Sequence, residues 1–202
     1  MTAKIPVNTQ ESYDTVARKI CDHLGLEYVE PLQAYAWQVH LVKSFERPLT
    51  LRVGIGQRTE NVRQEAWALR RLAGSPANPP VLHLIEETRT GETSITYLLR
   101  DYLEGSVLAD VGKLPPESVM PLERAVRISH RRGIAGLDIN EENVLITPSG
   151  ARLFDFSETM ERNVVGPERF KEARLYDLDD LARLFRYYVP SKPGDSIRCD
   201  QP

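Results

Sequence analysis

The stretch that decides the fold is HRRGIAGLDINEENVLITPSGARLFDFSE, residues 130–158. Its two apolar runs, NVLIT and ARLFDF, are separated by Pro148-Ser149-Gly150, which predicts two strands joined by a tight turn. Asp138 and Asn143 stand five residues apart in the loop before the first strand, and Asp155 ends the returning strand. We therefore expect the hairpin to bring these three oxygen-bearing side chains to one edge.

The three side chains suit a metal site beside a general base. The amide of Asn143 and the carboxylate of Asp155 offer the hard oxygen ligands that Mg²⁺ prefers. A separate carboxylate, that of Asp138, can accept the proton of an attacking hydroxyl. Asn and Asp are also common in turns for local reasons, because their side chains bond nearby backbone groups. The spacing, with an apolar strand between, favours a catalytic-type site and leaves open whether the site still catalyses.

The residues before this stretch predict a mainly β half. Residues 28–56 contain three alternating or β-branched runs, which predicts a three-stranded meander. Residues 59–72 carry apolar side chains at helical spacing, and residues 81–102 form two apolar runs around a glycine-containing turn. These patterns predict a helix followed by a hairpin. A short helix over residues 12–24, stopped by Gly25, comes first.

The residues after about position 105 predict a mainly α half. Residues 117–132 and 177–188 have the pattern of helices, the first ended by Gly133 and the second by Pro190. The change in character near residues 101–105 predicts an α+β protein of two lobes. The expected divisions are an N-terminal segment and helix over 1–26, a small β-rich lobe with its hinge over 27–105, a mainly α lobe over 106–190 and a tail over 191–202.

Composition narrows the choice of partners and compartment. The chain has 202 residues, with 26 Lys and Arg against 29 Asp and Glu, so its formal charge of -3 gives no strong nucleic-acid signal. The pairs Arg70-Arg71 and Arg131-Arg132 are typical of solvated helix ends. Absence of a bilayer-length apolar run or secretory signal favours a soluble cytoplasmic protein without membrane partners. Cys21 and Cys199 fit reduced thiols, although one terminal bridge stays open. Nothing indicates the oligomeric state.

At this point the sequence resembles the protein kinase-like superfamily. That family's catalytic loop reads H-R-D-x-x-x-x-N and its metal motif reads D-F-G. This chain has Gly136-Leu137-Asp138, then Asn143 at the matching offset, then Asp155-Phe156-Ser157. The loop motif is looser than in most protein kinases and is most similar to that of the small atypical kinases and the aminoglycoside-phosphotransferase-like branch. The resemblance covers about residues 27–188. It implies a bilobal fold with a shortened C-lobe, and it implies ATP and Mg²⁺ as cofactors.

The resemblance also implies roles in the second half of the chain. Asp138 would be the catalytic carboxylate, assisted by Asn143, and Asn143 with Asp155 would hold the metal. Asp177 resembles the aspartate that braces the catalytic loop from beneath. The partners implied are a nucleotide and an acceptor that the sequence does not identify.

In the first half, the resemblance points to four positions for the nucleotide. Arg52 matches the phosphate-binding lysine of the third strand, and Glu65 matches the ion-pair partner in the following helix. The stretch RDYLEG looks like the hinge after the fifth strand, whose backbone at Asp101 and Leu103 would meet an adenine ring.

Several residues depart from the family pattern. Residues 31–37 contain no glycine where the family has a glycine-rich loop, and Arg52 is bulkier than lysine. Gly136 replaces the loop histidine, and Ser157 replaces the glycine of the metal motif. We therefore keep three functions open. The first is an ATP- and Mg²⁺-dependent phosphotransferase acting on a small molecule or an atypical protein site. The others are a catalytically impaired pseudokinase that serves as a scaffold, and a kinase fold recruited to a different group transfer.

Overall fold

The structure is a computed structural model that describes residues 12–32, 38–90 and 92–190. Most of the glycine-free stretch and the whole tail over 191–202 lie outside the described residues. Contacts divide the chain into two compact units. The first comprises Met1–Arg70 with Pro80–Leu103, and the second comprises Arg71–Pro79 with Glu104–Pro202.

The first unit is built on a five-stranded antiparallel sheet, and the expected meander and hairpin are both present. Its strands are β1 (Glu27–Pro31), β2 (Val39–Ser44), β3 (Arg47–Ile55), β4 (Leu82–Thr90) and β5 (Thr93–Asp101). The strand order is β1-β2-β3-β5-β4, so the hairpin joins the meander through its second strand. This order makes β3 and β5 central, and their residues are almost all buried.

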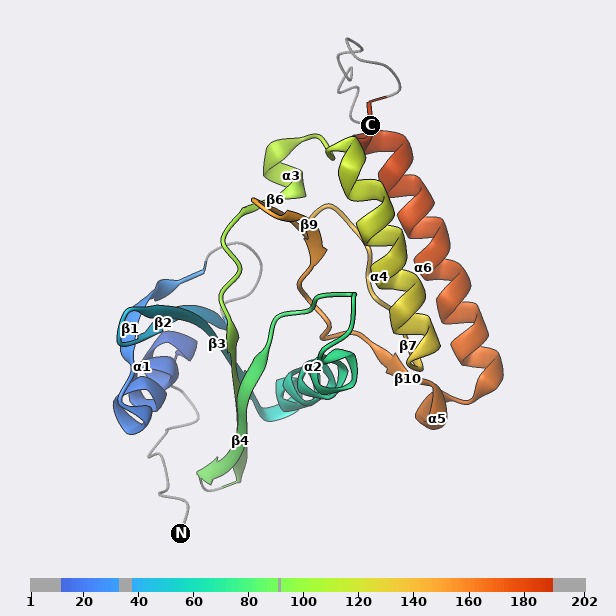
Figure 1. The fold of residues 1–202 in the computed structure, drawn as a ribbon. Coiled ribbons are helices and arrows are strands. Elements are labelled where there is room, and N and C mark those ends of the chain that lie inside the picture. The colour runs from blue at the N-terminus through green and yellow to red at the C-terminus, as the bar shows by residue number, and fades with distance from the viewer. Residues whose placement is uncertain (1–11, 33–37, 91, 191–202) are drawn as a thin grey trace. The chain divides into compact units, whose positions relative to one another are not determined.

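Two helices cover opposite faces of this sheet (Figure 1). Helix α1 (Tyr13–Leu24) packs its apolar stripe on the face that carries Leu49, Leu51 and Val53. Helix α2 (Thr59–Leu72), which follows the short 3₁₀ turn η1 (Gly56–Arg58), packs on the face that carries Leu98. Because side chains alternate along a strand, Arg52 lies on the α2 face, between two residues of the α1 face.

The start and end of α1 follow from local chemistry. The Ser12 hydroxyl accepts the Thr15 N–H at 3.3 Å, which satisfies one of the free donors of the first turn. Gly25 ends the helix at φ 67°, and its N–H donates to the Cys21 carbonyl. The predicted helix over residues 12–24 is thus present within one residue.

The second unit combines two long helices with short strand pairs. Its elements are β6 (Ser106–Val107), α3 (Leu108–Val111), η2 (Pro116–Ser118), α4 (Val119–Arg131), β7 (Ile134–Ala135), β8 (Val144–Thr147), β9 (Gly150–Leu153), β10 (Met160–Glu161), α5 (Arg162–Val165) and α6 (Pro167–Tyr188). Helices α4 and α6 lie side by side (Figure 1). The strands form a three-stranded sheet, β6-β8-β9, and a separate pair, β10-β7.

The last helix corrects one expectation. The sequence pattern predicted a helix over residues 177–188, but α6 begins ten residues earlier, at Pro167. Its buried stripe consists of Phe170, Ala173, Asp177, Leu181 and Leu184. The charged residue Asp177 in the middle of this stripe interrupts the apolar pattern, so the sequence indicates a helix only from that position onward. The second hairpin strand is also shorter than expected, because β9 ends at Leu153.

Two further findings concern the cysteines and the helices. Cys21 is a free, buried thiol, and burial raises its pKa to about 11, while Cys199 lies outside the described residues. Among the described residues, no helix has both the length and the apolar character needed to cross a bilayer.

Candidate functional site

The hairpin of β8 and β9 places two of the predicted site residues at the same end. Val144 pairs with Leu153 at the open end of the ladder. Asn143 directly precedes Val144, and Asp155 follows Leu153 by two residues. Because paired strands run antiparallel, the residue before one strand and the residues after the other leave the sheet at the same edge.

Asp138 and Asn143 are in direct contact. The Asn143 Nδ2 donates to Asp138 Oδ2 at 2.8 Å and to the Asp138 carbonyl at 2.9 Å. Asn140 shapes the loop between them, since its Oδ1 accepts the N–H groups of Glu142 and Asn143 at 2.8 and 3.0 Å. Among the described residues, Asp138 Oδ1 and Asn143 Oδ1 accept no hydrogen bond. Each of these two atoms can therefore receive a ligand group.

A buried carboxylate holds the backbone that leads to Asp138. Asp177, 1% exposed, accepts the Leu137 N–H on Oδ1 at 2.7 Å and the Gly136 N–H on Oδ2 at 3.1 Å. The same Oδ2 lies 2.7 Å from His130 Nε2 at the end of α4. The sequence did not predict this side-chain contact of His130 with Asp177.

The backbone at this loop explains the glycine that replaces the family's histidine. Gly136 has φ +69°, and a Cβ there would lie 3.3 Å from the Glu158 carbonyl oxygen. A larger residue would therefore be strained. Asp138 itself has φ 46°, an uncommon conformation that Asp tolerates better than most residues. Two positive-φ residues, Gly136 and Asp138, thus flank Leu137, whose N–H is held by Asp177.

Asp155 sits in a turn that the serine substitution leaves intact. The backbone N–H of Ser157 donates to Asp155 Oδ1 at 2.9 Å, so this contact does not depend on the Ser157 side chain. Phe156 between them is 3% exposed and anchors the turn in the core. Among the described residues, no three His, Cys, Asp or Glu side chains gather to hold a metal. Amide and carboxylate oxygens, as in Asn143 and Asp155, are ligand types that Mg²⁺ accepts together with water and phosphate oxygens.

A pocket of about 480 Å³ opens beside Asp138 within the second unit. Five carboxylates line it, against the single cation Arg169, and Tyr176 and Met160 add apolar surface. Burial raises the pKa of Asp180 in this pocket, and the carboxylates of Asp177, Asp179 and Asp138 add to the rise against the opposing Arg183. The pocket is thus acidic. Its carboxylates are Asp138, Glu158, Glu172, Asp177 and Asp180.

In the first unit, the predicted pair of Arg52 and Glu65 is present and buried. Arg52 Nη1 donates to Glu65 Oε2 at 2.5 Å, and the two side chains are 6% and 0% exposed. A second guanidinium, that of Arg100, lies 3.2 Å from Glu65 Oε1 and is 6% exposed. Thr50 pairs with Arg100 and Arg52 with Leu98, which puts both arginines on the same face of the sheet. The cluster carries two positive charges and one negative charge.

The participation of Arg100 was not predicted from the sequence, where the residue was assigned to the start of the hinge stretch RDYLEG. The neighbouring hinge position is also more constrained than expected. The N–H of Asp101 donates to the Val81 carbonyl at 3.0 Å, so it is already engaged. Its side chain accepts from Arg47 at 2.6 Å and contacts His83 Nε2 at 2.8 Å. Burial raises the pKa of Asp101, but these hydrogen bonds outweigh that effect and leave it lowered.

Leu103, the second hinge position, is half-buried in the stretch between β5 and β6. Among the described residues, its backbone N–H and carbonyl make no hydrogen bond. They are therefore available to a ligand, as a hinge contact with an adenine ring requires.

Comparison with known proteins finds similarity to protein kinases. No protein-family model matches the sequence. A probable serine/threonine-protein kinase of Clostridium perfringens is 28% identical over 103 residues, which are 46% of this chain and 14% of that protein. The solved structure of the kinase PK-1 of Cydia pomonella granulovirus matches with a TM-score of 0.57 at 18% identity, covering 73% of this chain and 56% of that one. The chain thus spans a small part of the first protein and just over half of the second.

Proposed function

We propose that this chain, which has a protein kinase-like fold, is a phosphotransferase that moves the γ-phosphoryl group of ATP, with Mg²⁺, to an acceptor hydroxyl. The acceptor is a small molecule or an atypical protein site. The observation that carries the proposal is the contact of Asp138 with Asn143 on a loop held by Asp177. A carboxylate oriented by an amide, with one oxygen left for a ligand, is what this transfer requires.

In this proposal Asp138 accepts a proton. The acceptor oxygen bonds to the γ-phosphorus while the bond to the β-phosphate oxygen breaks, and the hydroxyl proton passes to Asp138 Oδ1. The Asn143 amide on Oδ2 fixes the rotation of the carboxylate, so that Oδ1 faces the acceptor. Positioning and charge neutralisation supply most of the rate in this class of reaction.

The remaining roles are divided between a metal site and a buried cation cluster. Asn143 Oδ1 and the Asp155 carboxylate would hold Mg²⁺, which neutralises phosphate charge when bound. The cluster of Arg52, Arg100 and Glu65 has a net positive charge, which supports a role in holding the α and β phosphates. The backbone of Asp101 and Leu103 would meet the adenine ring, Asp101 through its carbonyl only, because its N–H donates to the Val81 carbonyl.

The acidic pocket beside Asp138 indicates the charge of the acceptor. Five carboxylates against Arg169 repel an anionic acceptor and attract a cationic one. We therefore expect an alcohol that also carries amino or guanidino groups, in a small molecule or a basic peptide.

The test is turnover of Asp138→Asn with ATP, Mg²⁺ and a panel of amine-bearing alcohols, followed as ADP formation and product mass. We expect a loss of about 10²–10⁴-fold, because the substitution removes the proton acceptor. Asp179→Asn is the matched control: it removes an exposed carboxylate of α6 outside the pocket lining and should change turnover less than about twofold. Undiminished turnover in Asp138→Asn would refute the role of Asp138.

A pseudokinase is the second candidate, favoured by a specific observation. Arg52 stands where the family has lysine, and its guanidinium is almost fully buried against Glu65. An arginine engaged in this way has less freedom to follow a phosphate than a lysine. A thermal unfolding titration with ATP and Mg²⁺ separates the two candidates. A ligand at 100 times its Kd stabilises by about 2.7 kcal/mol. Stabilisation without turnover supports a nucleotide-binding scaffold, and its absence speaks against both nucleotide roles.

A further inference from the structure

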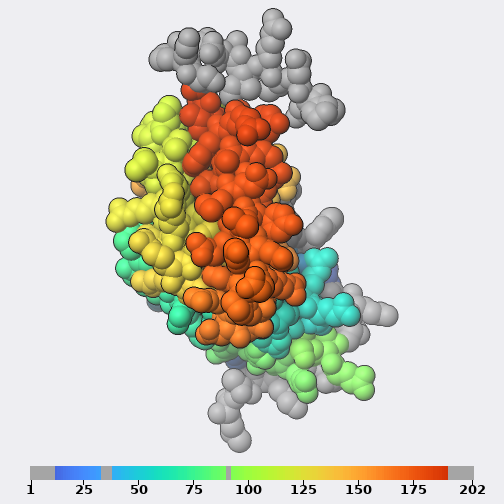
Figure 2. Space-filling model, turned by 90° about the vertical axis from the view of Figure 1, so that its right-hand side faces the viewer, coloured from blue at the N-terminus to red at the C-terminus, as the bar shows by residue number. Residues whose placement is uncertain are grey.

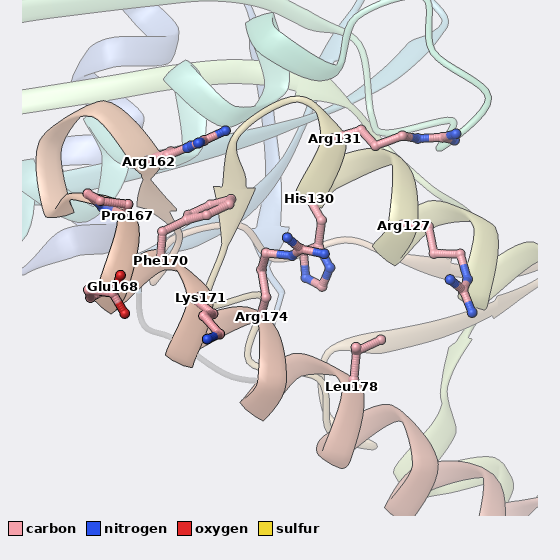
Figure 3. A pocket seen from close by; sticks show the side chains of 10 residues that line it. All are labelled: Arg127, His130, Arg131, Arg162, Pro167, Glu168, Phe170, Lys171, Arg174 and Leu178. Carbon is pink, nitrogen blue, oxygen red and sulfur yellow. The ribbon is translucent and has the colours of Figure 1, made fainter.

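A second pocket in the second unit has the opposite charge. It measures about 550 Å³ and is lined from α4, α5 and α6 (Figure 3). Five of its lining side chains are cationic, and one carboxylate, Glu168, opposes them. The cations are Arg127 and Arg131 of α4, Arg162 of α5, and Lys171 and Arg174 of α6.

Four of these five cations have no partner within the described residues. Arg127 is paired with Glu123 of its own helix, at 2.6 Å. Arg131, Arg162, Lys171 and Arg174 form neither an ion pair nor a side-chain hydrogen bond with any described residue. The whole chain has a formal net charge of -3, so a cluster of cations is not explained by an excess of basic residues. Unpaired like charges around one hollow repel each other, and a bound anion relieves that repulsion.

The shape and wall chemistry of the pocket fit a compact anion. Its volume falls in the range of small-molecule sites, which is about 300–1,000 Å³. Phe170, 4% exposed, and Leu178 give it an apolar wall, and His130 lies on its inner side. Arginine presents paired donors that match phosphate oxygens, and four of the five cations are arginines.

The basic pocket is separate from the acidic pocket beside Asp138. The two pockets share no lining residue, although both use α6. Lys171, Arg174 and Leu178 lie along one edge of the helix, and Glu172, Tyr176 and Asp180 lie along another. Helix α6 (orange to red in Figure 2) forms an exposed ridge of the second unit. A ligand in the basic pocket is therefore distinct from any group transferred at Asp138.

We propose that this pocket is a binding site for a small molecule that carries two or more clustered phosphate groups. Arg131, Arg162, Lys171 and Arg174 contact the phosphates, and the apolar wall contacts the rest of the molecule. The inference does not depend on phosphotransfer, because none of its residues belongs to the proposed catalytic set.

The test is titration calorimetry of the full chain with inorganic tripolyphosphate, in EDTA at low salt. The wild type should bind in a saturable way, and the double variant Arg131→Gln, Arg174→Gln should bind at least about tenfold more weakly, because two charge-assisted contacts are lost. Circular dichroism and thermal unfolding check that both exposed substitutions leave the fold intact.

The matched control is Arg124→Gln, Arg186→Gln, which removes the same charge from the same two helices. Both residues are exposed and lie outside the pocket lining. Its affinity for tripolyphosphate should stay within about twofold of the wild type. Equal weakening in the two double variants would show that binding follows net charge, and would overturn the proposal. Absence of saturable binding to the wild type would overturn it as well.

Two further measurements set the class of ligand. Sulfate should bind at least about tenfold more weakly than tripolyphosphate, since it offers one anionic centre to several cations. A 20-nucleotide single strand is the macromolecular alternative. If it binds more tightly than tripolyphosphate and Arg124→Gln, Arg186→Gln weakens it as much as the pocket variant does, the site is part of an extended nucleic-acid surface and the small-molecule proposal is wrong.

Discussion

Two buried carboxylates, one in each unit, are neutralised in different ways. Glu65 in the first unit is 0% exposed and faces two guanidinium groups, those of Arg52 and Arg100. Asp177 in the second unit is 1% exposed and accepts two backbone N–H groups and the His130 ring. Glu65 therefore fixes where positive charge lies, whereas Asp177 fixes the course of the backbone.

This difference separates electrostatic from geometric control of a site. A carboxylate that balances buried cations cannot be lost without leaving their charge in the interior. A carboxylate that binds backbone donors leaves neutral groups unsatisfied when it is lost, which costs less free energy but releases the loop. Substitutions at the two positions should therefore differ both in the free energy of unfolding and in what moves.

The largest effect should come from Glu65→Gln. The substitution leaves Arg52 and Arg100 buried with no counter-charge from residue 65, so the free energy of unfolding should fall by about 3–5 kcal/mol. Urea unfolding at pH 7 measures this loss. Glu60→Gln on the same helix is the control, because its ion pair with Arg63 is exposed and should change stability by at most about 1 kcal/mol. Equal losses in both variants would remove the electrostatic role of Glu65.

Asp177→Asn should have the second largest effect, and it should act on one loop. Hydrogen bonds to a charged acceptor contribute about 1.5–3 kcal/mol, so we expect a loss in that range. Amide exchange by NMR should show faster exchange of the Leu137 N–H than of amides in β3 or β5. Asp179→Asn, an exposed change two residues away, should leave both quantities unaltered. Unchanged protection of Leu137 in Asp177→Asn would contradict the bracing role.

His40 extends the comparison to a buried base in the first unit. Burial lowers its pKa to about 4, from 6.5 in the unfolded chain. The unfolded chain therefore binds a proton in this interval that the folded chain does not, so stability is complete above pH 6.5 and falls as the pH drops toward 4. Between pH 7 and pH 5 the loss should be about 2 kcal/mol.

Urea unfolding at the two pH values measures the His40 contribution. His40→Gln should largely remove the difference, whereas His23→Gln, an exposed histidine in α1, should retain it. A pH dependence that survives in His40→Gln would assign the acid sensitivity to other groups.

Much of the fold followed from patterns that act locally. Gly25 stopped α1 where expected, and alternation located all five strands of the first sheet. The local pattern did not predict that β5 pairs with β3, because the order of strands depends on pairings between residues distant in sequence. The start of α6 was missed because Asp177 occupies a buried helical position, and its burial is satisfied by groups forty and more residues away.

The candidate site shows the same division. Spacing alone predicted that Asp138 and Asn143 lie together, since both belong to one short loop. It did not reveal Arg100, whose burial depends on a helix that packs over its strand, nor the contact of His130 with Asp177. It described Arg131 correctly as a solvated end of α4, but it did not reveal that this residue lines a pocket with cations from two other helices.

The shared carboxylate of Glu65 has a consequence for how this chain can change over generations. Glu65 forms ion pairs with both Arg52 and Arg100. A mutation at one of these three positions should therefore destabilise the fold unless another of them is also substituted. A lysine at position 52 would therefore replace one of the two guanidinium groups that share Glu65. Substitutions at the three positions should therefore be correlated among homologues. A relative with a different residue at one position should also differ at another.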